Sequence, residues 1–218
     1  MTTPRKIVFW EVDAQADFML PGGKLYVPGA EKIIPNIRRL VQAAADAGVF
    51  LVSSGDAHPV GDPEFQRFPP HCLAGTPGAR IIPEGIAKNS QTIPNDPSRP
   101  LPRDILRAPQ VVIEKQTLDV FDNPHTSELV DRLGADAEYF VFGVVTEYCV
   151  RCAAKGLLAR GRKVAVVKDA IEPLDAAEGD KTIAELQTLG ARMIATDEAL
   201  AEIGVSASNR VALKSEPD

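Results

Sequence analysis

Short runs of apolar residues alternate along this chain with stretches of helical periodicity, and this alternation constrains the fold more than any other feature. The runs lack the polar–apolar alternation of a strand with one face in solvent, so both faces of each strand are expected to be buried. Six runs are predicted to be strands: residues 6–12, 49–53, 110–114, 138–142, 163–168 and 191–195.

Helical patterns separate these runs at 30–47, 125–133, 149–159 and 177–189. In the first of them, Ile33, Ile37, Leu40 and Ala44 recur at spacings of three and four, and Gly48 follows as a stop signal. Buried strands that alternate with helices indicate a parallel sheet covered on both sides. We therefore predict an α/β fold: one domain with three layers, α/β/α, around a six-stranded, mainly parallel sheet.

The middle of the chain has a different composition. Eleven of the 18 prolines lie between residues 59 and 109. A long segment without strong periodicity inside a compact domain is usually functional or disordered, and we favour an ordered, functional excursion at about 56–109. The domain is expected to span 1–205, with a weakly ordered tail at 206–218.

Charge and hydropathy exclude several classes of protein. Lysine and arginine total 24 against 30 for aspartate and glutamate, a net charge of −6, whereas a binder of nucleic acid or of anionic membranes needs a basic face. No apolar run approaches the roughly 18 residues of a transmembrane helix. The first run contains Glu11 and ends at Asp13, too short and too acidic for a signal peptide. We expect a soluble, cytoplasmic protein without nucleic-acid or membrane partners.

Polar side chains follow five of the predicted strands. Because ligands of an open parallel sheet bind beyond the carboxyl ends of its strands, these residues are candidates for chemistry: Asp13, Asp56 with His58, Lys115, Cys149 and Asp169. Aspartate, lysine and cysteine at three strand ends are expected to converge in one crevice.

Cys149 stands at a predicted strand-to-helix turn. The free N–H groups and the dipole of a helix N-terminus favour an anion, which predicts a lowered thiol pKa and a reactive thiolate. Taken alone, Cys149 also fits a buried cysteine that packs as a small hydrophobic residue. The spacing from Cys149 to Cys152 matches a redox dithiol as well, although no glycine or proline lies between the two cysteines.

Three segments together resemble the signatures of the isochorismatase-like cysteine hydrolases. They are Val12-Asp13-Ala14-Gln15-Ala16-Asp17-Phe18, the lysine Lys115 after a strand, and Gly143-Val144-Val145-Thr146-Glu147-Tyr148-Cys149-Val150. They occur in the family's order, and the resemblance extends from about residue 6 to 195.

The resemblance implies a set of catalytic roles. Cys149 would be the nucleophile, Asp13 the base that takes its proton, and Lys115 the cation that holds the thiolate and the substrate in place. The backbone N–H groups of Val145 and Cys149 would form the oxyanion hole, with a cis peptide bond between Val144 and Val145. Elementary electrostatics agree, because an aspartate beside a lysine stays ionised. Gln15 and Asp17 are expected to orient Asp13 or to act as caps.

Carboxylate and imidazole groups at the start of the proline-rich excursion suit a zinc, manganese or iron ion. Asp56-Ala57-His58 followed by Pro69-Pro70-His71-Cys72 resembles the nicotinamidase branch of the family. That resemblance implies one divalent metal ion with Asp56, His58 and His71 as ligands. The fourth ligand would be Glu64, with Asp62 as the alternative. The alternative to a metal site is that His58 and His71 only form hydrogen bonds within an ordered loop.

In that branch the metal holds a pyridine nitrogen between apolar rings, and Phe18 and Phe68 match the ring positions. The chain departs from the branch where Phe68 stands in place of a frequent tryptophan and where no Tyr/Ser-rich segment follows Lys115. The predicted reaction is hydrolysis of a small carboxamide, and the best candidate is nicotinamide, which would give nicotinate and ammonia. The resemblance also implies a role in NAD salvage and a homo-oligomer. One alternative is another family member that acts on an N-carbamoyl, ureido or vinyl-ether substrate. The other is a redox or binding module built on Cys149 and Cys152.

Overall fold

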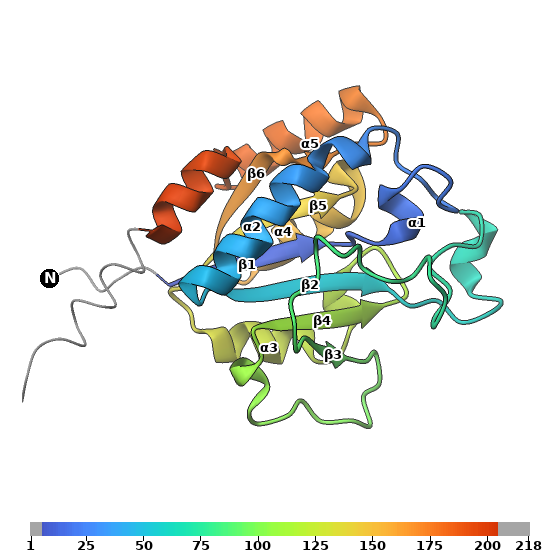
Figure 1. The fold of residues 1–218 in the computed structure, drawn as a ribbon, viewed down its shortest axis with the longest axis horizontal. Coiled ribbons are helices and arrows are strands. Elements are labelled where there is room, and N and C mark those ends of the chain that lie inside the picture. The colour runs from blue at the N-terminus through green and yellow to red at the C-terminus, as the bar shows by residue number, and fades with distance from the viewer. Residues whose placement is uncertain (1–5, 205–218) are drawn as a thin grey trace, which may run out of the picture.

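Seven strands form a single sheet in the computed structural model, which describes residues 6–204 (Figure 1). The strand order is β3-β4-β2-β1-β5-β6-β7, and every neighbouring pair among these strands is parallel. The bounds are β1 Ile7–Val12, β2 Phe50–Asp56, β3 Gln91–Ile93, β4 Gln110–Lys115, β5 Glu138–Val144, β6 Lys163–Glu172 and β7 Arg192–Ile194. The predicted fold class is confirmed.

The predicted number of six strands is wrong by one. The additional strand, β3, lies inside the proline-rich segment at the edge of the sheet and has only three residues. Of these, Ile93 alone is buried. A strand this short, with two exposed side chains, carries no hydrophobic run, so sequence periodicity cannot detect it.

Helices cover both faces of the sheet (Figure 1). Apolar side chains of α3, α4 and α5 pack on one face, and those of α2 and of a helix at 196–204 pack on the other. The bounds are α1 Ala16–Met19, α2 Ile34–Ala47, α3 Thr126–Leu133, α4 Arg151–Ala159 and α5 Ala176–Thr188. Single turns of 3₁₀ helix occur at Ala30–Ile33, Pro63–Gln66, Ile105–Arg107 and Val120–Asp122, and a π turn at Thr146–Val150. The three predicted layers are therefore present.

The order of the strands determines where a ligand can bind. From β1 at the centre, β2, β4 and β3 extend to one side and β5, β6 and β7 to the other. In open α/β sheets, the crevice at such a switch in direction is the usual binding site. Residues 57–90, between β2 and β3, extend from the carboxyl end of β2. The tail predicted at 206–218 lies outside the described residues, and no helix within them is long and apolar enough to span a bilayer.

Candidate active site

Four neighbouring strands bring an acid–base cluster to one edge of the sheet. Lys115 is the last residue of β4, Asp56 the last of β2, and Asp13 follows β1, while Cys149 lies in the turn after β5. Lys115 Nζ lies 2.9 Å from Asp13 Oδ2 and 3.6 Å from Cys149 Sγ, and it also pairs with Asp56 Oδ1. All four side chains are buried. The convergence expected from the strand ends is therefore seen in the structure.

Burial and charge together determine the protonation of this cluster. Burial alone would lower the pKa of Lys115, but the Asp13 and Asp56 carboxylates hold it well above its usual value. Burial likewise would raise the pKa of Asp56, yet Lys115 and the adjacent imidazoles of His58 and His71 hold it below the usual range. For Asp13, burial prevails over Lys115 and the pKa is raised. The cluster thus contains a lysine that stays cationic.

The thiol differs from the sequence-based expectation. Burial raises the pKa of Cys149, and although Lys115 opposes the shift, Asp13 and Asp56 add to it, so the pKa lies well above its usual value. The prediction of a lowered pKa is wrong for the resting site, because it considered a helix N-terminus and one lysine without the two carboxylates. Burial and the two carboxylates thus favour the protonated form of the thiol.

The turn that carries Cys149 also begins earlier than predicted. Helical geometry starts at Thr146 as a π turn, and α4 follows at Arg151. The Val145 carbonyl accepts hydrogen bonds from the N–H groups of Tyr148 and Val150, on either side of Cys149. The peptide bond between Val144 and Val145 is cis, as predicted.

A second cluster lies beside the first and shares Asp56 with it. Asp56 Oδ2 lies 3.6 Å from His58 Nε2 and 3.5 Å from His71 Nε2. One ligand atom from each of these three buried residues falls within 4.8 Å of the others. The predicted ligands Asp56, His58 and His71 are thus brought together.

The donor atoms of this cluster fit a divalent metal ion. Both ring nitrogens of His58 are buried, and neither has a hydrogen-bond partner among the described residues. His71 Nδ1 lies 2.9 Å from the Pro69 carbonyl oxygen, and His58 Nδ1 lies in ion-pair contact with Asp62 Oδ2 at 3.1 Å. Metal-bound histidines usually have one ring nitrogen directed at the ion and the other directed at a hydrogen-bond acceptor.

The two candidates for a fourth ligand have different positions. Asp62 contacts His58 Nδ1, and its Oδ1 accepts a hydrogen bond from the Glu64 N–H. Glu64 lies outside the group of three ligand atoms but lines the same cavity as Asp56 and His71. Burial, and then the charge of Asp56, raises the pKa of Glu64. Its position inside the cavity favours Glu64 over Asp62.

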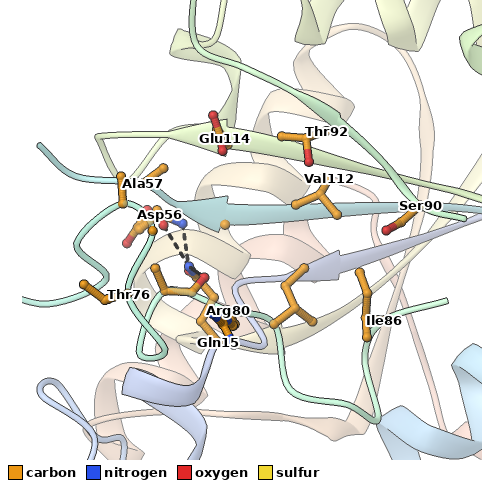
Figure 2. Close-up of a pocket in the computed structure, with 15 residues that line it drawn as sticks. Gln15, Asp56, Ala57, Thr76, Arg80, Ile86, Ser90, Thr92, Val112 and Glu114 are labelled. Carbon is orange, nitrogen blue, oxygen red and sulfur yellow. Dashed lines mark hydrogen bonds between the residues drawn. The ribbon is translucent and has the colours of Figure 1, made fainter. Parts of the chain in front are cut away.

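Gln15 and Asp17 hold the second cluster rather than Asp13. A cavity of about 410 Å³ is lined by residues of β2 and β4. Figure 2 shows the Gln15 side chain in its wall, hydrogen-bonded to Asp56. Gln15 Nε2 donates to Asp56 O at 2.8 Å, and Gln15 Oε1 accepts from Asp56 N at 2.7 Å. Asp17 accepts from the N–H of Cys72, next to His71, at 2.7 Å. Sequence spacing carried no sign of these partners.

Gly78 allows Asp17 to reach the histidine loop. A Cβ at Gly78 would lie 2.3 Å from the Asp17 carboxylate oxygens, closer than any real contact. A side chain at residue 78 would therefore push the carboxylate away from the Cys72 N–H.

A cavity connects the two clusters. It is lined by the predicted ring residues Phe18 and Phe68, by Asp13, Asp56, Glu64, His71 and Cys149, and by seven residues that sequence reasoning did not single out as lining residues: Leu25, Val27, Leu118, Val144, Val145, Tyr148 and Leu174. The Phe18 and Phe68 rings lie 5.3 Å and 6.4 Å from the His71 ring. Apolar side chains therefore surround the thiol and the imidazoles.

Two polar residues lie elsewhere. Asp169 is inside β6 rather than beyond its end, and it accepts hydrogen bonds from the N–H and hydroxyl of Thr196 at the start of the last helix. His125, to which no role was assigned, contacts the Asp96 carbonyl oxygen through Nε2 at 2.9 Å.

Comparison with known proteins gives a consistent result. The family model "Isochorismatase domain" matches residues 8–94 and 88–198. The chain is 27% identical to a nicotinamidase of Escherichia coli (80% of this chain, 88% of that protein) and 29% identical to a nicotinamidase/pyrazinamidase of Mycobacterium tuberculosis (82% and 91%). The structure is similar to that of a zinc-complexed pyrazinamidase of Pyrococcus horikoshii, with TM-score 0.71 and 26% identity over 87% of this chain and 99% of that one.

Proposed function

Since the chain belongs to the isochorismatase family and is an isochorismatase-like hydrolase, we propose that it is a metal-dependent cysteine amidohydrolase that cleaves a small carboxamide. Hydrolysis of nicotinamide to nicotinate and ammonia is the reaction that the site supports best. One observation carries the proposal: a single apolar cavity is lined by Cys149, by its neighbour Asp13 and by the metal-type residues Asp56 and His71.

The proposed first step forms a thioester. As the Cys149 proton passes to Asp13, Lys115, 3.6 Å from the sulfur, stabilises the developing thiolate; Sγ attacks the amide carbon and the negative charge moves to the carbonyl oxygen. The backbone N–H groups of Val145 and Cys149 are the proposed donors to the oxyanion, and each such donor contributes about 3 kcal/mol. Asp13 then gives the proton to the departing nitrogen, which leaves as ammonia.

The second step reverses these roles. Asp13 takes a proton from water, the hydroxide oxygen attacks the thioester carbon, and the Cys149 sulfur leaves and regains a proton. Asp13 thus accepts and returns one proton in each half-reaction. A divalent ion held by Asp56, His58 and His71, with Glu64 nearby, would supply a Lewis-acidic binding point for a ring nitrogen.

The cavity favours an uncharged substrate. Among the described residues that line it, none is arginine or lysine, and Phe18 and Phe68 offer apolar surfaces. An N-carbamoyl amino acid or a vinyl-ether dicarboxylate would bring a carboxylate close to Asp13, Asp56 and Glu64, with no arginine or lysine among the lining residues to pair with it. A flat, neutral amide meets no such penalty.

Ammonia release from a panel of small amides tests the reaction. Cys149→Ala is expected to lower the rate by about 10⁴-fold or more, since the nucleophile is lost. Cys152→Ala, three residues further on and also a free thiol, serves as the matched control and is expected to keep most of the activity. Unchanged ammonia release by Cys149→Ala contradicts the mechanism. Equal loss in both variants, with a reversible disulfide between the two thiols, supports the redox alternative.

Metal analysis tests the second half of the site. Purified protein is expected to hold about one zinc, manganese or iron ion per chain, and a chelator to lower activity until the ion is restored. His58→Ala should lose both the ion and the activity, whereas His125→Ala should lose neither. Full activity of the metal-free protein favours another family reaction.

We extend the proposal to the setting of the enzyme: a homo-oligomer in the cytoplasm with a role in NAD salvage. Light scattering on the purified protein measures the oligomeric state, and cell fractionation measures the location.

A further inference from the structure

We propose that Leu174 is a specificity-determining residue of the active-site cavity and that Glu147 is the residue that positions it. Leu174 would then set which amides enter, and its identity as a substrate contact rests on the function proposed above. The evidence comes from the connection between β6, which ends at Glu172, and α5, which begins at Ala176.

Leu174 forms the solvent-facing side of the cavity. It lines the cavity together with Cys149, Leu118 and Tyr148, and half of its surface (50%) is exposed. The other apolar lining residues are buried or partly buried. An incoming ring therefore meets the Leu174 side chain at the opening, and this side chain limits how far the ring can extend.

The Glu147 carboxylate ties Leu174 to the turn that carries the thiol. Its Oε1 accepts hydrogen bonds from the N–H groups of Leu174 at 2.9 Å and of Asp175 at 2.8 Å. Glu147 precedes Cys149 by two residues in the same π turn. One side chain thus links Leu174 directly to the turn that carries the nucleophile.

The connection is also held from its other side. A Cβ at Gly179, in α5, would lie 2.7 Å from Pro173 Cβ, so the helix packs closely against the residue before Leu174. Asp175 caps α5 by accepting from the Glu178 N–H at 3.0 Å. Leu174 is therefore a fixed part of the cavity wall.

An isobutyl group at this position selects by size and polarity. It packs against a single flat ring. The second ring of a bicyclic amide would clash with it, and a charged ring substituent would be desolvated against it. Monocyclic, uncharged aromatic carboxamides are the class that fits.

Steady-state kinetics on a monocyclic amide, nicotinamide, and a bicyclic one, quinoline-3-carboxamide, test the role of Leu174. Leu174→Ala is expected to raise the bicyclic-to-monocyclic ratio of kcat/KM by about tenfold, and Leu174→Phe to lower it. Leu189→Ala is the matched control, because Leu189 is also half exposed (49%) and lies just after α5, outside the cavity lining. An unchanged ratio in Leu174→Ala, or the same change in Leu189→Ala, overturns the inference.

Glu147 variants separate positioning from folding. Glu147→Ala removes the acceptor, and KM for nicotinamide should rise by about tenfold with the size ratio relaxed. Glu147→Gln keeps an oxygen that can accept both N–H groups and should restore KM. Equal KM values in wild type and Glu147→Ala contradict the positioning role.

The rate of Cys149 alkylation tests the role of Leu174 in the cavity wall without requiring amide hydrolysis. The rates of adduct formation with iodoacetamide and with a bulky N-aryl iodoacetamide are followed by mass spectrometry. Leu174→Ala should accelerate the bulky reagent about tenfold more than the small one. If wild type hydrolyses no amide, the proposed function fails while this ratio still decides the role of Leu174. If amides are hydrolysed and neither ratio moves, the function stands and the role of Leu174 is refuted.

Discussion

The two halves of the site are held in place by different means. Asp13 and Lys115 stand at the ends of strands that pair in register with β2, so the sheet itself brings them together. His58 and His71 lie on the segment between β2 and β3. The side chains of Gln15 and Asp17 form hydrogen bonds with the adjoining backbone, and the His58 N–H donates to the Cys72 carbonyl oxygen at 3.1 Å. The first half depends on the order of the strands, and the second on a few side-chain and backbone hydrogen bonds.

This contrast has an energetic consequence. Strand positions are supported by many ladder hydrogen bonds and by packing on both faces, so one substitution seldom moves them. A loop held by a few hydrogen bonds is displaced more easily when one of its buried side-chain partners is removed. The strand-end half should therefore fail through lost charge balance, and the loop half through lost position.

The largest effect is expected at Lys115. Lys115→Met removes the cation between two buried carboxylates, so activity should fall by about 10⁴-fold and the free energy of unfolding by about 3–5 kcal/mol. Amidase assays and urea denaturation measure the two effects. Lys163→Met, at an exposed position of β6, is the control and should change neither. Wild-type stability in Lys115→Met would show that the carboxylates do not depend on the lysine.

A smaller effect is expected from Glu11, within β1 below the strand ends. Burial raises the pKa of Glu11 to about 8, although a hydrogen bond from Ser53 opposes the shift. The folded state thus favours the protonated form. This contribution to stability is complete below about pH 4.5 and is lost as the pH rises from there through about 8.

Denaturation at pH 6 to 9 measures this loss. Glu11→Gln should flatten the decline and make the protein more stable than wild type at pH 9, whereas Glu128→Gln, on the exposed side of α3, should leave the decline unchanged. An identical decline in wild type and Glu11→Gln would assign the pH dependence to other groups.

The smallest effect is expected at Asp17, and it bears on the loop half alone. Asp17→Ala removes the acceptor for the N–H groups of Cys72 and Lys24, so metal affinity should fall by about 10–100-fold, as for other residues that orient ligands. Titration with zinc measures the affinity, and Asp46→Ala, on the exposed side of α2, is the control. Unchanged affinity would show that the histidine loop holds its shape without this contact.

Much of the fold is predictable from local pattern. The central strands are apolar on both faces because helices cover both sides of the sheet, and such runs are recognisable without any partner. The three-residue β3 and the four-residue α1 are too short to show a period, and their pairing partners supply their stability. Sequence patterns missed both for that reason.

For the site, the sequence by itself determined the chemical inventory: one thiol, one lysine and two carboxylates at strand ends, with two histidines nearby. Residue type and strand position are local properties, and so they could be read directly. Only the tertiary structure decided that burial and two carboxylates raise the pKa of Cys149, that Gln15 and Asp17 help to hold the histidine loop, and that Leu174 borders the cavity. Burial, charge balance and hydrogen-bond partners depend on contacts between residues far apart in the chain, and no local pattern encodes them.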